Sequence, residues 1–112
     1  MLNNYVGVGR LVSDPEIKET ENERKEAIIT LAIPRPFKNE DGEYETDFVP
    51  VKLFNVVATN TSEYCHKGDI IGVKGRIQTY NIEKEDGTKE TKIELIAEKV
   101  TFLSSKSKDE EE

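Results

Sequence analysis

Short apolar segments, each closed by a turn signal, constrain the fold of this chain most strongly. Runs of β-branched and alternating apolar residues predict strands, and an Asp-Gly pair between two runs predicts a hairpin turn. Asp41-Gly42 separates the second segment from the third, and Asp86-Gly87 separates the fourth from the fifth. The segments are residues 5–12, 27–33 (closed by Pro34), 47–58, 69–79 and 91–102. The sequence therefore predicts an all-β fold.

One stretch favours a helix instead. Residues 59–66 begin with four residues that suit a helix N-terminus and end before Gly68, so one or two helical turns are expected there. Residues 16–20 are interpreted as a continuation of the first strand after a kink. In the fifth segment the apolar phase slips after Ala97, which predicts a β-bulge.

The expected order is strand, strand, strand, helix, strand, strand. This is the order of an OB-fold, a five-stranded Greek-key barrel that here carries one short helix between strands three and four. Strands two and three of such barrels, with the adjoining loops, bind oligonucleotides or oligosaccharides. A binding face is therefore expected on residues 27–58.

Length and composition exclude several classes of protein. A chain of 112 residues predicts one domain. It has no apolar run of about 18 residues and no signal-peptide pattern, so neither a membrane partner nor secretion is expected. Cys65 is the single cysteine, which excludes an intrachain disulfide and a cysteine-rich zinc site. We expect a cytoplasmic protein without metal or cofactor.

The net charge of −7 opposes a nucleic-acid partner, because binding footprints are usually basic. The acids are unevenly placed, however, and four of them form the run 109–112. Local faces of the barrel can therefore still be positive. Residues 104–112 contain no apolar residue and predict a disordered acidic tail after a folded domain over 1–103.

Alternation along the third strand predicts an outer face that carries rings and a cation. Successive side chains point to opposite faces of a strand, so Val49, Val51, Leu53 and Val57 are expected inside. The opposite parity holds Phe48, Pro50, Lys52, Phe54 and Val56. Aromatic rings stack on unpaired bases and nearby cations neutralise phosphate. The alternative is that Phe48 and Phe54 pack under a loop or in a subunit contact.

The neighbouring segments extend this face. The hairpin before the third strand adds Arg35, Phe37 and Lys38. In the fourth strand Ile71, Val73 and Ile77 are expected inside. The opposite parity of that strand holds Lys74, Arg76, Gln78 and Tyr80. Two adjacent strands would then place rings and cations outside one β core.

An ordered series of segments resembles the bacterial single-stranded DNA-binding proteins. The segments are LNNYVGVGRLVSDPEI, ITLAIPRPFKNEDGEYETDFVPVKLFN, EYCHKGDIIGVKGRIQTYNIEKEDGTKET and AEKVTFL, and together they cover residues 2–103. The resemblance implies an OB-fold, usually a homotetramer, that holds single-stranded DNA on aromatic and basic residues without strong sequence preference. It implies roles in DNA replication, recombination and repair, and a nucleoid-associated location.

By position, the resemblance implies that Phe37, Phe48 and Phe54 stack on bases. Lys67 follows the helix at a position that is commonly basic in the family. The complete set of expected DNA-binding residues is Phe37, Phe48, Phe54, Arg35, Lys38, Lys52, Lys67, Lys74, Arg76 and Tyr80.

The chain departs from the family pattern in three places. Relatives often carry Trp at the stacking positions, whereas this chain has no Trp. Ile82 stands where relatives usually have an aromatic residue, and Tyr80 is expected to substitute for it. The acidic end lacks the Pro-Phe tip with which relatives recruit replication and repair proteins, so replication or recombination proteins are expected partners only with an atypical tip.

Catalysis is not expected. His66 follows Cys65 directly, and adjacent residues on one helical turn point apart, so they do not form a nucleophile–base pair. Gly7-Val8-Gly9 lies within a strand and lacks the third glycine of a dinucleotide site. The alternative function is a protein-interaction OB module, such as a primosome or recombination accessory factor, which the negative charge and the missing tryptophans would suit. A homotetramer is expected, with a dimer as the second choice.

Overall fold

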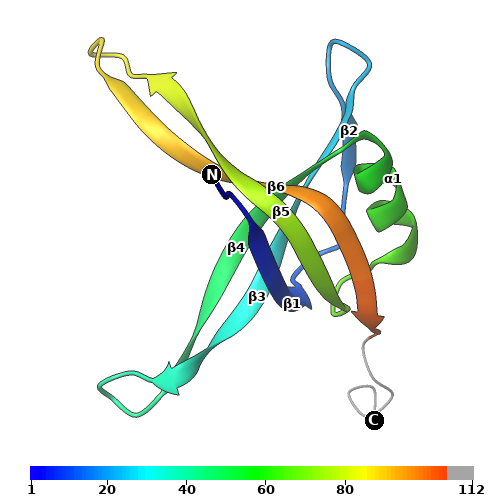
Figure 1. Cartoon of the computed structure of the whole chain (residues 1–112), viewed down its shortest axis with the longest axis vertical. Coiled ribbons are helices and arrows are strands. Elements are labelled where there is room, and N and C mark those ends of the chain that lie inside the picture. The colour runs from blue at the N-terminus through cyan, green and yellow to red at the C-terminus, as the bar shows by residue number, and fades with distance from the viewer. Residues whose placement is uncertain (106–112) are drawn as a thin grey trace.

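The computed structural model describes residues 1–105 and shows one closed barrel with a short helix (Figure 1). The elements in chain order are β1 (Tyr5–Leu11), β2 (Ile17–Glu19), β3 (Lys25–Lys38), β4 (Tyr44–Phe54), α1 (Asn55–Tyr64), β5 (Ile70–Glu83) and β6 (Lys89–Ser104). No helix in these residues is long and apolar enough to cross a membrane.

Five of the strands close into a ring. β1 pairs with β5, β5 with β6, and β3 with β4, all antiparallel, while β4 meets β6 in parallel at Lys52 and Ile96. The ring closes where Arg10 and Leu11 of β1 pair with Ala32 and Leu31 of β3. This strand order is that of the OB-fold, and the predicted fold is confirmed.

The core is aliphatic. Its largest fully buried side chains are Leu11, Leu31, Leu53, Ile71, Val51 and Val73. Val51 and Leu53 therefore point inward, as the alternation predicts. None of the eight aromatic residues (four Phe and four Tyr) is buried, although aromatic side chains usually dominate protein cores. Six of the eight rings are exposed on the outside of the barrel, whereas Tyr5 packs against the core and Phe54 is half-buried.

The junction between β4 and α1 differs from the prediction. β4 ends at Phe54 and the helix spans Asn55–Tyr64, not 59–66. Val56 is thus exposed on the helix, whereas Val57 and Ala58 pack in the core. Asn55 has φ 54°, a left-handed conformation that Asn tolerates better than most residues, and this turns the chain directly from strand to helix. The apolar residues continue through the turn, so alternation did not reveal it.

The β3–β4 and β5–β6 hairpins extend as long arms beyond the barrel (Figure 1). The β3–β4 arm comprises residues 33–48 and the β5–β6 arm comprises residues 77–94. The prediction that this strand is closed by Pro34 is wrong, because β3 continues through Pro34 and Pro36. A proline lacks the N–H that a central strand needs, and here β3 has only β4 beside it. The prediction that Ile77 points inward is wrong: it is 44% exposed, because β5 has left the barrel at that point.

The predicted bulge after Ala97 is confirmed. Gly75 of β5 pairs with Ala97, whereas Lys74 pairs with Lys99, so Glu98 has no residue opposite it in the β5–β6 register. At this point the two strands approach so closely that a Cβ on Gly75 would stand 2.0 Å from the carbonyl oxygen of Ile96. Only glycine fits this contact.

Two boundaries also need correction. Residues 17–19 do not continue the first strand but form the separate strand β2, which pairs with β3. Ser104 belongs to β6, one residue beyond the predicted domain boundary. The predicted tail lies, from residue 106 onward, outside the described residues.

Candidate nucleic-acid interface

Three aromatic rings stand on the β3–β4 arm. Phe37 is 63%, Tyr44 61% and Phe48 64% exposed. Phe48 lies at the root of the arm opposite Ala32, and Tyr44 pairs with Lys38 near the tip. The Lys38 ammonium is 5.8 Å from the centroid of the Tyr44 ring. The arm therefore offers rings and a cation to one ligand.

Phe54, the third predicted stacking residue, lies at the other end of β4 and is half-buried. The Arg24 guanidinium lies over its ring, 4.3 Å from the centroid, and the Lys52 ammonium is 5.9 Å away. Cations at these distances are attracted to the face of an aromatic ring. Phe54 thus has a guanidinium over its ring, unlike the rings on the arm.

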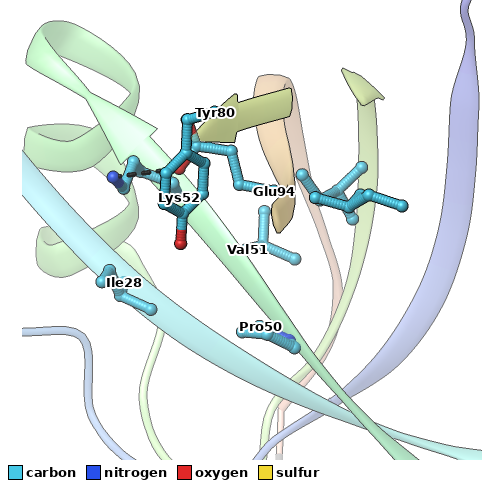
Figure 2. Close-up of a pocket in the computed structure, with 8 residues that line it drawn as sticks. Ile28, Pro50, Val51, Lys52, Tyr80 and Glu94 are labelled. Carbon is cyan, nitrogen blue, oxygen red and sulfur yellow. Dashed lines mark ion pairs between the residues drawn. The ribbon is translucent and has the colours of Figure 1, made fainter. Parts of the chain in front are cut away.

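A shallow hollow of about 190 Å³ lies on the outer side of the barrel where β3 and β4 meet β5 and β6 (Figure 2). Its lining residues are Ile28, Pro50, Val51, Lys52, Tyr80, Ile93, Glu94 and Leu95. Tyr80 is 45% exposed and stands beside Lys52 and Glu94 in the figure. The hollow therefore combines one ring, apolar side chains and an ion pair.

Lys52 is held by two carboxylates from other strands. Its Nζ lies 3.3 Å from Glu26 Oε1 and 3.1 Å from Glu94 Oε2. Burial lowers the pKa of Lys52, but the bonds to Glu94 and Glu26 outweigh it, and the pKa is raised. Burial raises the pKa of Glu94, whereas hydrogen bonds from Gln78 and Lys52 outweigh it and lower the pKa. Both partners are therefore charged at neutral pH.

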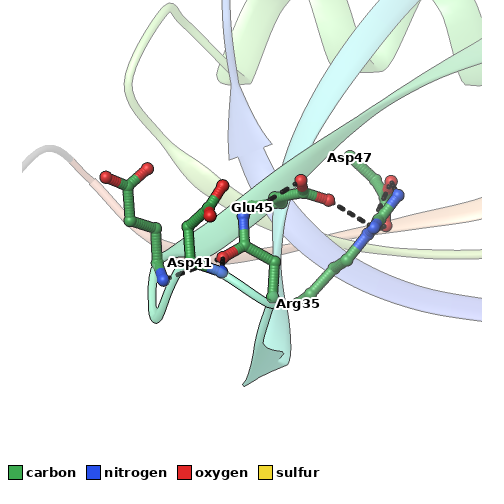
Figure 3. Close-up of polar contacts among 6 residues, drawn as sticks. Arg35, Asp41, Glu45 and Asp47 are labelled. Atoms are coloured by element: carbon green, nitrogen blue, oxygen red, sulfur yellow. Dashed lines mark hydrogen bonds and ion pairs between the residues drawn. The ribbon is translucent and has the colours of Figure 1, made fainter.

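Arg35 is held in the same manner on the arm (Figure 3). Its Nη2 donates to Asp47 Oδ1 at 2.9 Å, its Nε lies 3.2 Å from both oxygens of Asp47, and its Nη1 donates to Glu45. The hydrogen bond from Arg35 lowers the pKa of Asp47, and the hydrogen bond and charge of Asp47 raise the pKa of Arg35. The guanidinium is thus neutralised by two acids from β4.

The other predicted cations lie on separate elements. Lys67 is exposed in the turn after α1, where its backbone N–H donates to Asp14. Lys74 is exposed on β5 and pairs with Val6 of β1. Arg76, also on β5, has its Nη1 3.7 Å from Glu98 Oε2. The structure brings Lys52 and Tyr80 together in the hollow, and Arg35, Phe37, Lys38 and Phe48 together on the arm. Lys67 and Lys74 lie outside both groups.

Sequence reasoning missed two members of this surface. Tyr44 escaped notice because the pairing between β3 and β4 is irregular from Pro34 to Lys38, so parity does not extend to the tip. Its signal was an aromatic residue two positions after the Asp41-Gly42 turn. Arg24 precedes β3 in an acidic turn, and nothing in its local sequence indicates Phe54 as its neighbour.

The sole cysteine belongs to the core. Cys65 is buried, and burial together with the charge of Asp69 raises the pKa of its thiol. His66 Nδ1 lies 4.0 Å from Asp69. Within residues 1–105, no three His, Cys, Asp or Glu side chains are grouped as metal ligands.

A closed five-stranded barrel with an aliphatic core and outward rings on β3 and β4 defines an OB-fold binding domain. Comparison with known proteins specifies it further: the single-strand binding protein family matches residues 2–103. The chain belongs to that family.

Curated relatives match almost the whole chain. It is 41% identical to single-stranded DNA-binding protein B of Bacillus subtilis, over 97% of this chain and 96% of that protein. It is 44% identical to single-stranded DNA-binding protein 2 of Staphylococcus aureus, over 96% of this chain and 76% of that protein. It is also 44% identical to single-stranded DNA-binding protein 3 of Listeria innocua, over 95% of this chain and 66% of that protein.

Proposed function

We propose that this protein binds and protects single-stranded DNA, without strong sequence preference, during replication, recombination and repair. The observation that carries the proposal is the placement of the rings. No aromatic side chain is fully buried, and three of the most exposed ones share the β3–β4 arm. Family membership and the names of the relatives support the same function.

Binding would combine stacking with phosphate contacts. Bases would lie on Phe37, Tyr44 and Phe48 along the arm, and the strand would continue past its root to Tyr80 in the hollow. Each stacked base contributes about 1–3 kcal/mol, largely independent of its identity. Lys38, Arg35 and Lys52 stand beside these rings to meet phosphates. Such a surface holds DNA and leaves it chemically unchanged.

A titration tests the function directly. Fluorescence anisotropy with labelled oligo-dT should show binding at low salt, with a log–log salt slope of about −0.7 per phosphate contacted. Labelled strand incubated with protein and magnesium should remain intact. Absence of binding at low-micromolar protein in about 50 mM salt would contradict the proposal and favour the alternative, a protein-interaction module, which the net charge of −7 suits.

For assembly we propose a homotetramer in which β1 supplies one contact. Residues Tyr5–Gly9 pair with β5 on one side, whereas β3 reaches only Arg10 and Leu11. Val6 is 69%, Val8 52% and Leu103 50% exposed. An open strand edge beside an apolar patch needs cover, and a second copy of the same edge would provide it. Light scattering that gives a mass near the 12.7 kDa protomer would contradict this assembly.

The cellular setting follows from the DNA-binding proposal. A protein that coats single strands would act on the nucleoid in the cytoplasm. Recruitment of replication or recombination proteins is proposed as a secondary role.

A further inference from the structure

Of the three cations proposed to meet phosphates, Arg35 and Lys52 are already paired with the protein's own acids. Arg35 donates to Asp47 through Nε and Nη2 and to Glu45 through Nη1. Lys52 is within 3.3 Å of carboxylate oxygens from Glu26 and Glu94. A phosphate that approached either cation would meet carboxylates in its place.

Carboxylate and phosphate are equivalent partners for these groups. A guanidinium presents a planar fork of donors that matches either anion, and an ammonium accepts either as a point charge. Asp47 takes the Nε–Nη2 edge of Arg35, which is an edge that a phosphate would use. Internal acids and DNA phosphates therefore compete for the same donors.

The acids also lie within the proposed path of the strand. Asp47 precedes the exposed ring of Phe48 in β4, and Glu94 lines the hollow together with Tyr80. A carboxylate that stayed in place would repel a phosphate of a base stacked on either ring. Binding therefore requires these pairs to open or to share their cation.

Opening the pairs is energetically feasible. Arg35, Glu45 and Asp47 have side chains that are 41–50% exposed, and ion pairs this exposed are weak because water screens them. A stacked base contributes as much as such a pair or more. The pair of Lys52 with Glu94 is less exposed, with side chains at 27% and 18%, and should open less readily.

We propose that single-stranded DNA binds by anion exchange: its phosphates replace Asp47 at Arg35 and Glu94 at Lys52, and these two acids act as internal competitors that weaken binding and reduce its salt dependence. The proposal rests on the DNA-binding function above. Each released carboxylate takes up a cation, which offsets a counterion released from the DNA. The salt slope should therefore be shallower than the number of phosphate contacts would give.

Carboxamide variants with a matched control test the exchange. Asp47→Asn removes the competitor on the arm, and Glu43→Gln makes the same charge change on the same arm with a carboxylate that forms no ion pair within residues 1–105. Oligo-dT affinity at about 50 mM salt should rise several-fold for Asp47→Asn and clearly less for Glu43→Gln. The salt slope of Asp47→Asn should steepen, by up to about 0.7 for one regained contact. Glu94→Gln should act in the same direction as Asp47→Asn.

The outcomes separate the two proposals. If the wild-type protein binds oligo-dT but Asp47→Asn binds equally or more weakly, or no better than Glu43→Gln, the exchange is wrong and the acids position the cations. If the wild type does not bind, the DNA-binding function is wrong and the exchange falls with it. Asp47 is exposed, so the Asp47→Asn protein should fold, and circular dichroism checks that it does. The test therefore does not depend on whether the half-buried Glu94 tolerates substitution.

Discussion

The β3–β4 and β5–β6 arms share a construction but differ in what they present to solvent. Each is an antiparallel hairpin that leaves the barrel and turns at an Asp-Gly pair, with φ 78° at Gly42 and 86° at Gly87. The first arm exposes Phe37, Tyr44 and Phe48. The second has one ring, Tyr80, and otherwise exposes Ile77, Ile82, Ile93 and polar or charged residues. Shape therefore does not distinguish the proposed DNA-binding arm from the other; the rings do.

Charge does not distinguish the arms either. On the β5–β6 arm Glu90 pairs with Lys84 at 3.2 Å and Lys92 at 3.0 Å, much as acids hold Arg35 on the β3–β4 arm. Regularity of pairing does differ: the β5–β6 ladder runs without a shift from Gly75–Ala97 to Glu83–Lys89, whereas the β3–β4 ladder is irregular between Pro34 and Lys38. The rings therefore sit on the less regular hairpin.

Removing rings from the β3–β4 arm should have the largest effect. Phe37→Ala combined with Phe48→Ala should weaken oligo-dT binding by about 1–3 kcal/mol per ring, roughly 5- to 150-fold for each. Tyr64→Ala, which removes a ring 69% exposed on α1, is the matched control and should leave the affinity nearly unchanged. Equal losses in both proteins would show that the arm is not the stacking surface.

Single substitutions on the two arms should rank them. Tyr44→Ala should cost about 1 kcal/mol of binding free energy, because its ring is fully presented beside Lys38. Tyr80→Ala should cost less binding free energy than Tyr44→Ala if the β3–β4 arm makes the stronger contacts with the DNA. Anisotropy titrations of the two variants decide the order, and a larger loss for Tyr80→Ala would reverse the assignment of the arms.

Adding a ring to the β5–β6 arm should partly erase the difference. Ile82 is 40% exposed, and Ile82→Phe would present a second ring near Tyr80. Affinity for long oligo-dT should rise by up to about tenfold, whereas affinity for an oligonucleotide too short to reach both arms should not change. A gain of equal size for both lengths would indicate a different contact.

The smallest effect concerns the acidic pairs and pH. The pKa values of Glu90 and Glu94 are lowered in the folded protein by their hydrogen-bonding partners, Lys92 and Gln78 respectively. A carboxylate whose pKa is lowered by folding stabilises the fold at pH above its pKa in the unfolded chain. This stabilisation is lost as the pH falls through its pKa in the folded protein. Melting temperature should therefore fall as pH drops below about 4.5, and by less in Glu94→Gln. An unchanged acid slope in that variant would show that Glu94 contributes no such linkage.

The local pattern of residues determined the barrel and the direction of most side chains. Five apolar segments with period-two alternation are enough to specify strands, and the same parity places Phe48 and Lys52 outside while Val51 and Leu53 fill the core. The slip of phase after Ala97 marked the bulge correctly. These features depend on neighbours a few positions apart, so the sequence contains them directly.

Only the tertiary structure decided which groups meet. Glu26, Glu94 and Lys52 come from three strands, and their contact depends on the β3–β4 register and on the parallel meeting of β4 with β6. The turn at Asn55 and the exposure of Ile77 depend on where the barrel ends. Alternation restricts the face that each side chain takes and hence the parity of the register. Which distant strand lies alongside is set by how the whole core packs.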